Sequence, residues 1–131
     1  MRKPQHPGPL LIVDDREDVR WALQRFLSLY FEQVHTAGTP DEAEAALNEY
    51  HPTLLLCDYW LGNEYPPATD LIPGWRERYP TIERVALMTG TKAAALGRVH
   101  CVDAVFQKPL DMNQVTDFLL GTGRKSQTQI S

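Results

Sequence analysis

The chain has 131 residues, of which 43% are hydrophobic and 23% are charged, and its formal net charge is -4. This length allows one domain with its own hydrophobic core, and the acidic balance with scattered Lys and Arg argues against direct nucleic-acid binding. No apolar run approaches the roughly 18 residues of a membrane-spanning helix, so we expect a cytoplasmic protein without membrane insertion.

Short apolar runs alternate with helical patterns along the chain. Residues 1–9 are rich in proline and have no periodic pattern, so they are predicted to form a flexible leader. Apolar runs predict strands at residues 10–13, 33–37, 53–58, 84–88 and 102–107. Apolar side chains at helical spacing predict helices at about residues 18–30, 39–50, 70–78, 91–99 and 111–121. Residues 122–131 are polar and aperiodic and are predicted to be a tail or linker, which leaves a domain over residues 10–121.

The alternation of strands and helices predicts the fold class. Strand-helix units joined by short connections form a parallel sheet with helices on both faces, an α/β architecture in three layers. In such sheets, ligands bind outside the carboxyl ends of the strands. The third helix is the weakest prediction, because Pro73 and Gly74 interrupt its pattern.

Several of the predicted strands end in reactive side chains. Asp14 and Asp15 follow the first strand, Asp58 ends the third, Thr89 follows the fourth, and Lys108 follows the fifth. Taken singly, each has an ordinary reading as a helix cap or turn residue. Together, they would lie at one edge of a parallel sheet.

A group of carboxylates at that edge predicts a metal site. Two carboxylates in contact repel by roughly 4 kcal/mol at an effective dielectric constant near 20, so the group needs a cation or must take up protons. Oxygen ligands in an open site with room for water suit Mg²⁺. With a lysine and a hydroxyl nearby, the site could hold a phosphoryl group, and one carboxylate could attack it.

These strand ends resemble the motifs of the receiver domains of two-component response regulators. The matching segments are Leu11-Ile12-Val13-Asp14-Asp15, Leu54-Leu55-Leu56-Cys57-Asp58, Ala86-Leu87-Met88-Thr89-Gly90 and Phe106-Gln107-Lys108-Pro109. The resemblance covers residues 9–120. It implies a flavodoxin-like, doubly wound five-stranded parallel sheet in the order 2-1-3-4-5.

The resemblance also implies roles for the acidic residues. Asp58 would accept the phosphoryl group from the phosphohistidine of a sensor histidine kinase or phosphotransfer protein. Asp15 would bind Mg²⁺ directly and Asp14 through water, and Asp58 and the backbone carbonyl of Trp60 would complete the protein ligands. The expected activity is limited to self-phosphorylation and self-dephosphorylation.

The remaining motif residues would contact the phosphoryl group. By the same resemblance, the hydroxyl of Thr89 would donate a hydrogen bond to a phosphoryl oxygen and move inward as a switch. Lys108 would pair with another phosphoryl oxygen, and the peptide bond before Pro109 is expected to be cis. Phosphorylation would then switch a surface that binds an output partner, which the sequence does not identify, and a homodimer is left open.

The chain departs from the receiver pattern at several places, two of which lie close to the predicted site. The position three residues before Lys108 usually carries Tyr or Phe, but here it is Val105, and the aromatic Phe106 follows on the opposite face of the strand. The loop after Asp58 is longer than usual and places the bulky Trp60 two residues after it. The Trp60 ring would either shield the phosphorylated Asp58 from water or pack beneath its own loop.

The sequence leaves two alternative functions. A pseudo-receiver would bind partners without phosphorylation, and the substitution at Val105 and the altered loop keep this alternative open. A small Mg²⁺-dependent phosphatase with an Asp nucleophile is disfavoured, because such enzymes usually carry a second Asp two residues later, where this chain has Trp60.

Overall fold

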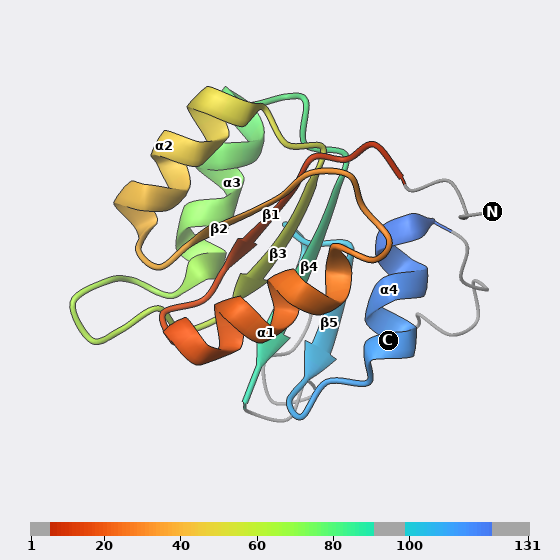
Figure 1. Cartoon of the computed structure of the whole chain (residues 1–131). Helices are drawn as coiled ribbons and strands as arrows, with labels where there is room; N and C mark the ends of the chain where they lie inside the picture. The colour runs from red at the N-terminus through yellow and green to blue at the C-terminus, as the bar shows by residue number, and fades with distance from the viewer. Residues whose placement is uncertain (1–5, 91–98, 122–131) are drawn as a thin grey trace, which may run out of the picture.

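The computed structural model describes residues 6–90 and 99–121 (Figure 1). In this part of the chain, the elements in order are β1 (Leu10–Val13), α1 (Glu17–Leu27), β2 (Val34–Ala37), α2 (Pro40–Tyr50), β3 (Leu54–Asp58), α3 (Ala68–Arg78), β4 (Arg84–Thr89), β5 (Ala104–Gln107) and α4 (Met112–Leu120). All but the last residue of the helix predicted at 91–99, and the whole tail predicted at 122–131, lie outside the described residues.

The strands form one parallel sheet in the order β2-β1-β3-β4-β5, which confirms the predicted topology. Every residue of β1 and β3 is buried, because helices cover both faces of these inner strands. The register aligns Val13 of β1 with Cys57 of β3, so Asp14 and Asp58 follow the aligned pair on neighbouring strands. The sheet therefore brings the acidic strand ends to one edge (Figure 1).

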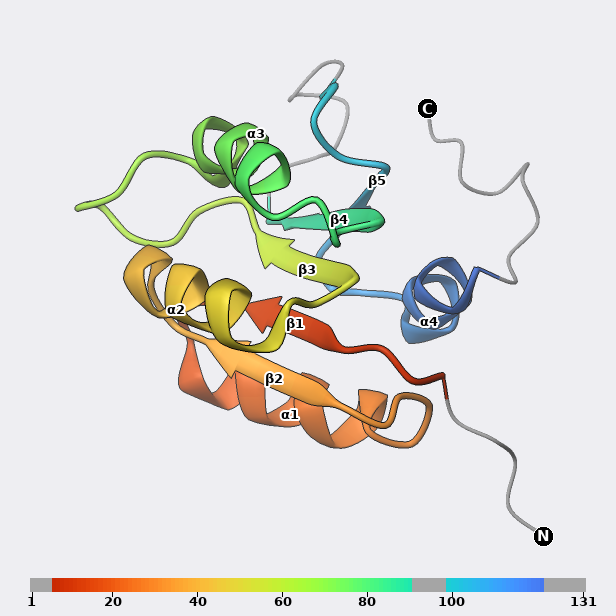
Figure 2. The same cartoon turned by 90° about the horizontal axis from the view of Figure 1, so that it is seen from above.

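In the part of the chain that the structure describes, α2 and α3 lie on one face of the sheet and α1 and α4 on the other (Figure 2). One core cluster joins α2 and α3 to side chains such as Leu11, Leu55 and Leu87, and the other joins α1 and α4 to Ile12 and Leu56. Alternate residues of each buried strand therefore contribute to opposite cores. Among the described helices, none combines the length and the apolar character that spanning a bilayer would require.

Side-chain caps define where the helices on either side of the site begin. Thr39 accepts a hydrogen bond from the Glu42 N–H, and Pro40 occupies the first turn of α2. Asp111 accepts hydrogen bonds from two backbone N–H groups at the start of α4. Gly121, with φ of 75°, ends that helix in the left-handed conformation that suits glycine.

Helix α3 forms where the sequence predicts a helix, although Pro73 and Gly74 lie within it. It runs without a break from Ala68 to Arg78 and buries Ile72 and Trp75 against the sheet. The indole N–H of Trp75 also donates a hydrogen bond of 3.1 Å to Glu44 of α2. Burial of these side chains outweighs the unfavourable helix propensity of proline and glycine.

Pro73 leaves one helical carbonyl without its usual backbone donor. Proline has no N–H to offer the carbonyl of Thr69, four residues earlier. The thiol of Cys101 lies against that oxygen, with 3.9 Å between Sγ and O. The helix thus continues past its proline with a side chain from another part of the chain beside the freed acceptor.

The structure describes residues 6–9 of the predicted leader, and they pack on the domain. The N–H of His6 donates to Tyr30, and the carbonyl of His6 accepts from Glu32, so this segment lies beside the connection between α1 and β2. The His6 ring also contacts Phe31, at 5.4 Å between centroids. Helix α1 ends at Leu27, before Tyr30, and the chain turns there to make these contacts.

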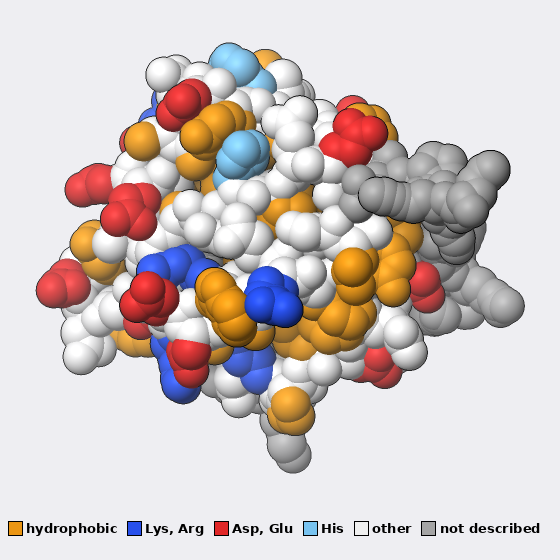
Figure 3. All heavy atoms as spheres, in the orientation of Figure 1, with side chains coloured by type: hydrophobic (Ala, Val, Ile, Leu, Met, Phe, Trp, Pro, Cys, Tyr) orange, Lys and Arg blue, Asp and Glu red, His pale blue; other side chains and the backbone are white. Residues whose placement is uncertain are grey.

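The face formed by α1 and α4 is mixed in character. Hydrophobic side chains appear there among acidic and basic ones (Figure 3). On α1, Trp21 is 59% exposed, and the guanidinium of Arg25 lies 4.7 Å from its ring centroid. Charges of both signs on this face give it no strong electrostatic preference for a nucleic acid.

Candidate functional site

Asp58 ends the central strand and is nearly enclosed. It is 8% exposed, and the preceding four residues of β3 are fully buried. Burial, and after it the negative charge of Asp14, raise the pKa of Asp58 to about 6, although the charge of Lys108 and its hydrogen bond act in the opposite direction. Asp58 is therefore a carboxylate whose charge requires support from its surroundings.

Asp14 is the most deeply buried acid of the site, with no exposed surface. Its backbone N–H donates to the carbonyl of Ala37, which extends the pairing of β1 and β2 by one residue. One carboxylate oxygen accepts a 3.0 Å hydrogen bond from the N–H of Arg16, and the other lies 3.2 Å from Nζ of Lys108. Asp15, the next residue, is exposed to solvent.

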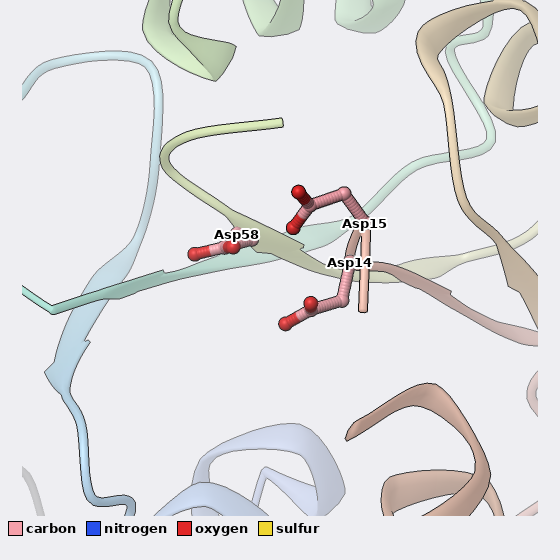
Figure 4. Close-up of side chains that lie close together, drawn as sticks. All are labelled: Asp14, Asp15 and Asp58. Atoms are coloured by element: carbon pink, nitrogen blue, oxygen red, sulfur yellow. The ribbon is translucent and has the colours of Figure 1, made fainter. Parts of the chain in front are cut away.

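The carboxylates of Asp14, Asp15 and Asp58 form a single cluster. One oxygen from each lies within 4.8 Å of the others, and Figure 4 shows them at the ends of β1 and β3. Three carboxylates so close together repel one another strongly unless cations or protons are present. An oxygen-only ligand set with one exposed member fits a hard divalent cation that keeps several waters.

Lys108 contacts two of these carboxylates at once. Its Nζ lies 3.2 Å from Oδ2 of Asp14 and 3.4 Å from Oδ1 of Asp58. Burial lowers the pKa of Lys108, but the charges of Asp58 and Asp14 and hydrogen bonds to both outweigh it, so the pKa is raised overall. The lysine therefore stays protonated and offsets part of the negative charge.

Thr89 and the Lys108–Pro109 bond complete the same edge. Thr89 ends β4, is 1% exposed, and its carbonyl accepts a 2.8 Å hydrogen bond from the N–H of Lys108. The Lys108–Pro109 peptide is cis, which confirms the prediction. The structure thus brings together the strand-end residues that the sequence singled out, while their roles in binding stay predictions.

Trp60 lies in the loop that follows Asp58. Its side chain is 46% exposed, whereas the next residue, Leu61, is 2% exposed and belongs to the core. Leu61 therefore anchors the loop, and the Trp60 ring does not pack beneath it. The role of the Trp60 carbonyl as a metal ligand stays a prediction.

The last strand places Val105 and Phe106 in different cores. Val105 packs against the cluster under α2 and α3, and Phe106 against the cluster under α1 and α4. The Phe106 ring meets Phe118 of α4 edge-on, at 5.9 Å between centroids. The aromatic ring of β5 thus packs on the side of the sheet opposite the position that the receiver pattern reserves for it.

One residue beside the site was not singled out by the sequence analysis. Arg20 of α1 donates a 2.9 Å hydrogen bond from Nη1 to the backbone carbonyl of Asp14. A basic residue in the first turns of an amphipathic helix is usually solvated, so its type and position give no local signal of this contact. The contact between Arg20 and Asp14 depends on how α1 packs on the sheet, which the sequence of α1 alone does not specify.

The sequence matches no family model, and no curated protein matches it. Solved structures do match in fold. The receiver domain (CheY-like) of a response regulator from Methylobacillus flagellatus has a TM-score of 0.76 and 20% identity, over 89% of this chain and 99% of that chain. The N-terminal signal receiver domain of a two-component response regulator from Bacteroides fragilis has a TM-score of 0.75 and 24% identity, over 91% and 98%.

A third solved structure also matches in fold and contains bound groups. A response regulator protein from Burkholderia pseudomallei has a TM-score of 0.72 and 26% identity, over 86% of this chain and 66% of that chain. That protein was solved with a phosphorylated aspartic acid, a calcium ion and citrate. Together with the sheet order, these neighbours confirm the predicted fold.

Proposed function

We propose that this chain, which has the fold of a response regulator receiver domain, accepts a phosphoryl group on Asp58 in a Mg²⁺-dependent reaction. The donor would be the phosphohistidine of a sensor histidine kinase or a phosphotransfer protein, and the product would switch a surface that binds an output partner. The observation that carries the proposal is the convergence of three carboxylates and Lys108 at one edge of the sheet.

In the proposed transfer, a carboxylate oxygen of Asp58 forms a bond to phosphorus as the P–N bond of the phosphohistidine breaks. The imidazole leaves with the electron pair of that bond. Lys108, already 3.4 Å from Asp58, would pair with a phosphoryl oxygen, and the hydroxyl of Thr89 would donate to another. Dephosphorylation would end the signal. Water would attack the phosphorus, the bond between phosphorus and the Asp58 oxygen would break, inorganic phosphate would be released and the carboxylate would be restored.

The acidic cluster fits the proposed metal. Asp14, Asp15, Asp58 and the carbonyl of Trp60 would hold Mg²⁺, with Asp14 acting through water. When bound, Mg²⁺ would offset the negative charge of the carboxylates and of the incoming phosphoryl oxygens. The response regulator from Burkholderia pseudomallei was solved with a phosphorylated aspartic acid and a calcium ion, which supports the proposal that proteins of this fold can combine the two.

Intact-mass measurement with a small phosphoryl donor tests the proposal. We expect the purified protein with Mg²⁺ to gain the mass of one phosphoryl group, and we expect no gain with a chelator or with Asp58→Asn. Asp41→Asn removes an exposed carboxylate that is not part of the acidic cluster, and this variant should still gain the phosphoryl group.

Other outcomes of this experiment would identify the alternatives. Rapid release of phosphate without an adduct would favour the phosphatase, and the absence of both would favour a phosphorylation-independent pseudo-receiver. The proposed function also places the protein in the cytoplasm, where the free thiols of Cys57 and Cys101 would stay reduced.

A further inference from the structure

Arg20 links the start of α1 to the main chain that carries the two adjacent acids. Its Nη1 donates a 2.9 Å hydrogen bond to the carbonyl of Asp14. The bond is to the backbone, so both carboxylate oxygens of Asp14 remain available to Arg16 and Lys108. Arg20 therefore fixes the position of the residue without competing for its ligand atoms.

Gly38 leaves the space that the Arg20 guanidinium occupies. A β-carbon at Gly38 would lie 2.5 Å from Nη1 and 3.1 Å from Cζ of Arg20. Gly38 follows β2 directly, and the preceding Ala37 accepts the N–H of Asp14. Because its φ is outside the left-handed region, the role of Gly38 here is to leave space for the guanidinium and not to supply a special backbone angle.

The position of Gly38 is itself fixed from α2. Its N–H donates a 2.7 Å hydrogen bond to Oε1 of Glu42, and the N–H of Glu42 donates to the hydroxyl of Thr39. The guanidinium of Arg20 thus packs against a turn that a neighbouring helix holds in place. The turn at Gly38 therefore limits how far the guanidinium can move away from Asp14.

We propose that Arg20 is a positioning residue that, seated on Gly38, holds the main chain at Asp14 so that Asp15 is presented to the metal. The inference rests on the proposed Mg²⁺ site. Asp15 is exposed, so the direction of its carboxylate depends on the backbone of the turn that carries it. Removing a residue that contacts and orients a metal ligand typically lowers metal affinity 10–100-fold.

Mg²⁺ titration of three variants tests the contact. The binding constant is measured from the backbone amide resonances of residues 15 and 59, and the melting temperature without metal is recorded in parallel. We expect Arg20→Ala to weaken Mg²⁺ binding about tenfold. Gly38→Ala should weaken it in the same direction, because it displaces the guanidinium while keeping its charge. The double variant should bind no more weakly than Arg20→Ala alone.

Control variants separate position from charge. Arg25→Ala removes a positive charge from the exposed face of the same helix and should leave Mg²⁺ affinity unchanged. Arg20→Lys keeps the charge without the planar donor group and should recover only part of the affinity. A loss of affinity in Gly38→Ala that remains in full when Arg20 is already Ala would overturn the inference.

The test distinguishes this inference from the proposed function. If the unaltered protein shows no saturable Mg²⁺ binding, the proposed metal site and the inference both fail. If the unaltered protein binds Mg²⁺ and Arg20→Ala or Gly38→Ala binds it equally well, only the inference fails. A lower melting temperature with unchanged affinity would also count against it, because it would mean a structural role alone.

Discussion

The ammonium group of Lys108, which follows β5, lies 3.4 Å from a carboxylate oxygen of Asp58, which ends β3. The same ammonium group contacts Asp14, which has no exposed surface. A single cation therefore offsets two carboxylates, one of them inaccessible to water. This arrangement makes Lys108 the residue whose removal should affect both stability and phosphoryl transfer.

Lys108→Met should destabilise the metal-free protein and slow phosphorylation. We expect a loss of about 1–3 kcal/mol in the free energy of unfolding at pH 7.5, since charged hydrogen bonds to buried groups are lost. Phosphorylation by a small donor should be roughly tenfold to hundredfold slower, because a charge that stabilises the transferring group is absent. Chemical denaturation and intact-mass time courses measure the two effects. Lys108→Arg should show the smaller loss of stability, and equal losses would contradict the pairing.

The stability of the metal-free protein should fall as pH rises through the titration of Asp58. The pKa of Asp58 is raised from 3.8 to about 6, so between these values the folded protein binds more protons than the unfolded chain. The stabilisation is complete below about pH 4 and is lost as the pH rises through about 6. A shift of about two pKa units corresponds to roughly 3 kcal/mol in the free energy of unfolding. Urea denaturation at a series of pH values, compared with Asp58→Asn, isolates this contribution. A variant with the same pH profile as the unaltered protein would refute it.

Mg²⁺ should stabilise the protein more at neutral than at acidic pH. A proton and the cation compete for the carboxylate of Asp58. Once this group is ionised, the site carries more negative charge, and Mg²⁺ binding stabilises the folded protein more. Thermal melting with and without MgCl₂ should therefore show a larger upward shift at pH 7.5 than at pH 5. A shift that is the same at both values, or that persists in Asp58→Asn at full size, would argue for binding elsewhere.

Trp60→Asn should shorten the lifetime of the phosphorylated protein. The Trp60 ring is half exposed, and Leu61 anchors the loop in its place, so the ring is available to shield phosphorylated Asp58 from water. The rate of phosphate loss from purified phosphoprotein measures the effect, and we expect a severalfold increase. Trp21→Phe, at another exposed indole, is the matched control and should leave the rate unaltered. An unchanged rate for Trp60→Asn would remove the shielding role.

Phe106→Ala should affect stability and leave phosphorylation unaltered. The ring packs on Phe118 in the core beneath α1 and α4, so its loss should cost about 2 kcal/mol, below the value for a fully buried ring. Phosphorylation by a small donor should stay within about twofold, because the ring does not reach the acidic cluster in this packing. Phe106→Leu should recover most of the stability. A slower reaction at normal stability would mean that Phe106 takes part in switching.

The sheet and its acidic edge could be predicted because buried parallel strands have a simple pattern. Each is a short apolar run, and the first polar residue after it must lie at the carboxyl edge. This reasoning brings Asp14, Asp58 and Lys108 together, although they are far apart in the chain. Their proximity follows from topology, which the alternation of strands and helices already defines.

Other features depend on contacts that no local pattern contains. Pro73 lies within a continuous helix because neighbouring apolar side chains are buried, and residues 6–9 pack because Phe31 and Tyr30 turn toward them. The contact of Arg20 with Asp14 depends on the space left by a glycine that follows a different strand. Propensity and periodicity describe one segment at a time, so they do not reveal such pairings.

Strand β3 is enclosed on both faces from Leu54 to Asp58, and its two neighbours in the sheet hold it on both sides. A group attached to the end of so constrained a backbone has little freedom to shift when it is chemically altered. We therefore expect any structural response to modification of Asp58 to occur in the loops that follow the strands and not in β3 itself.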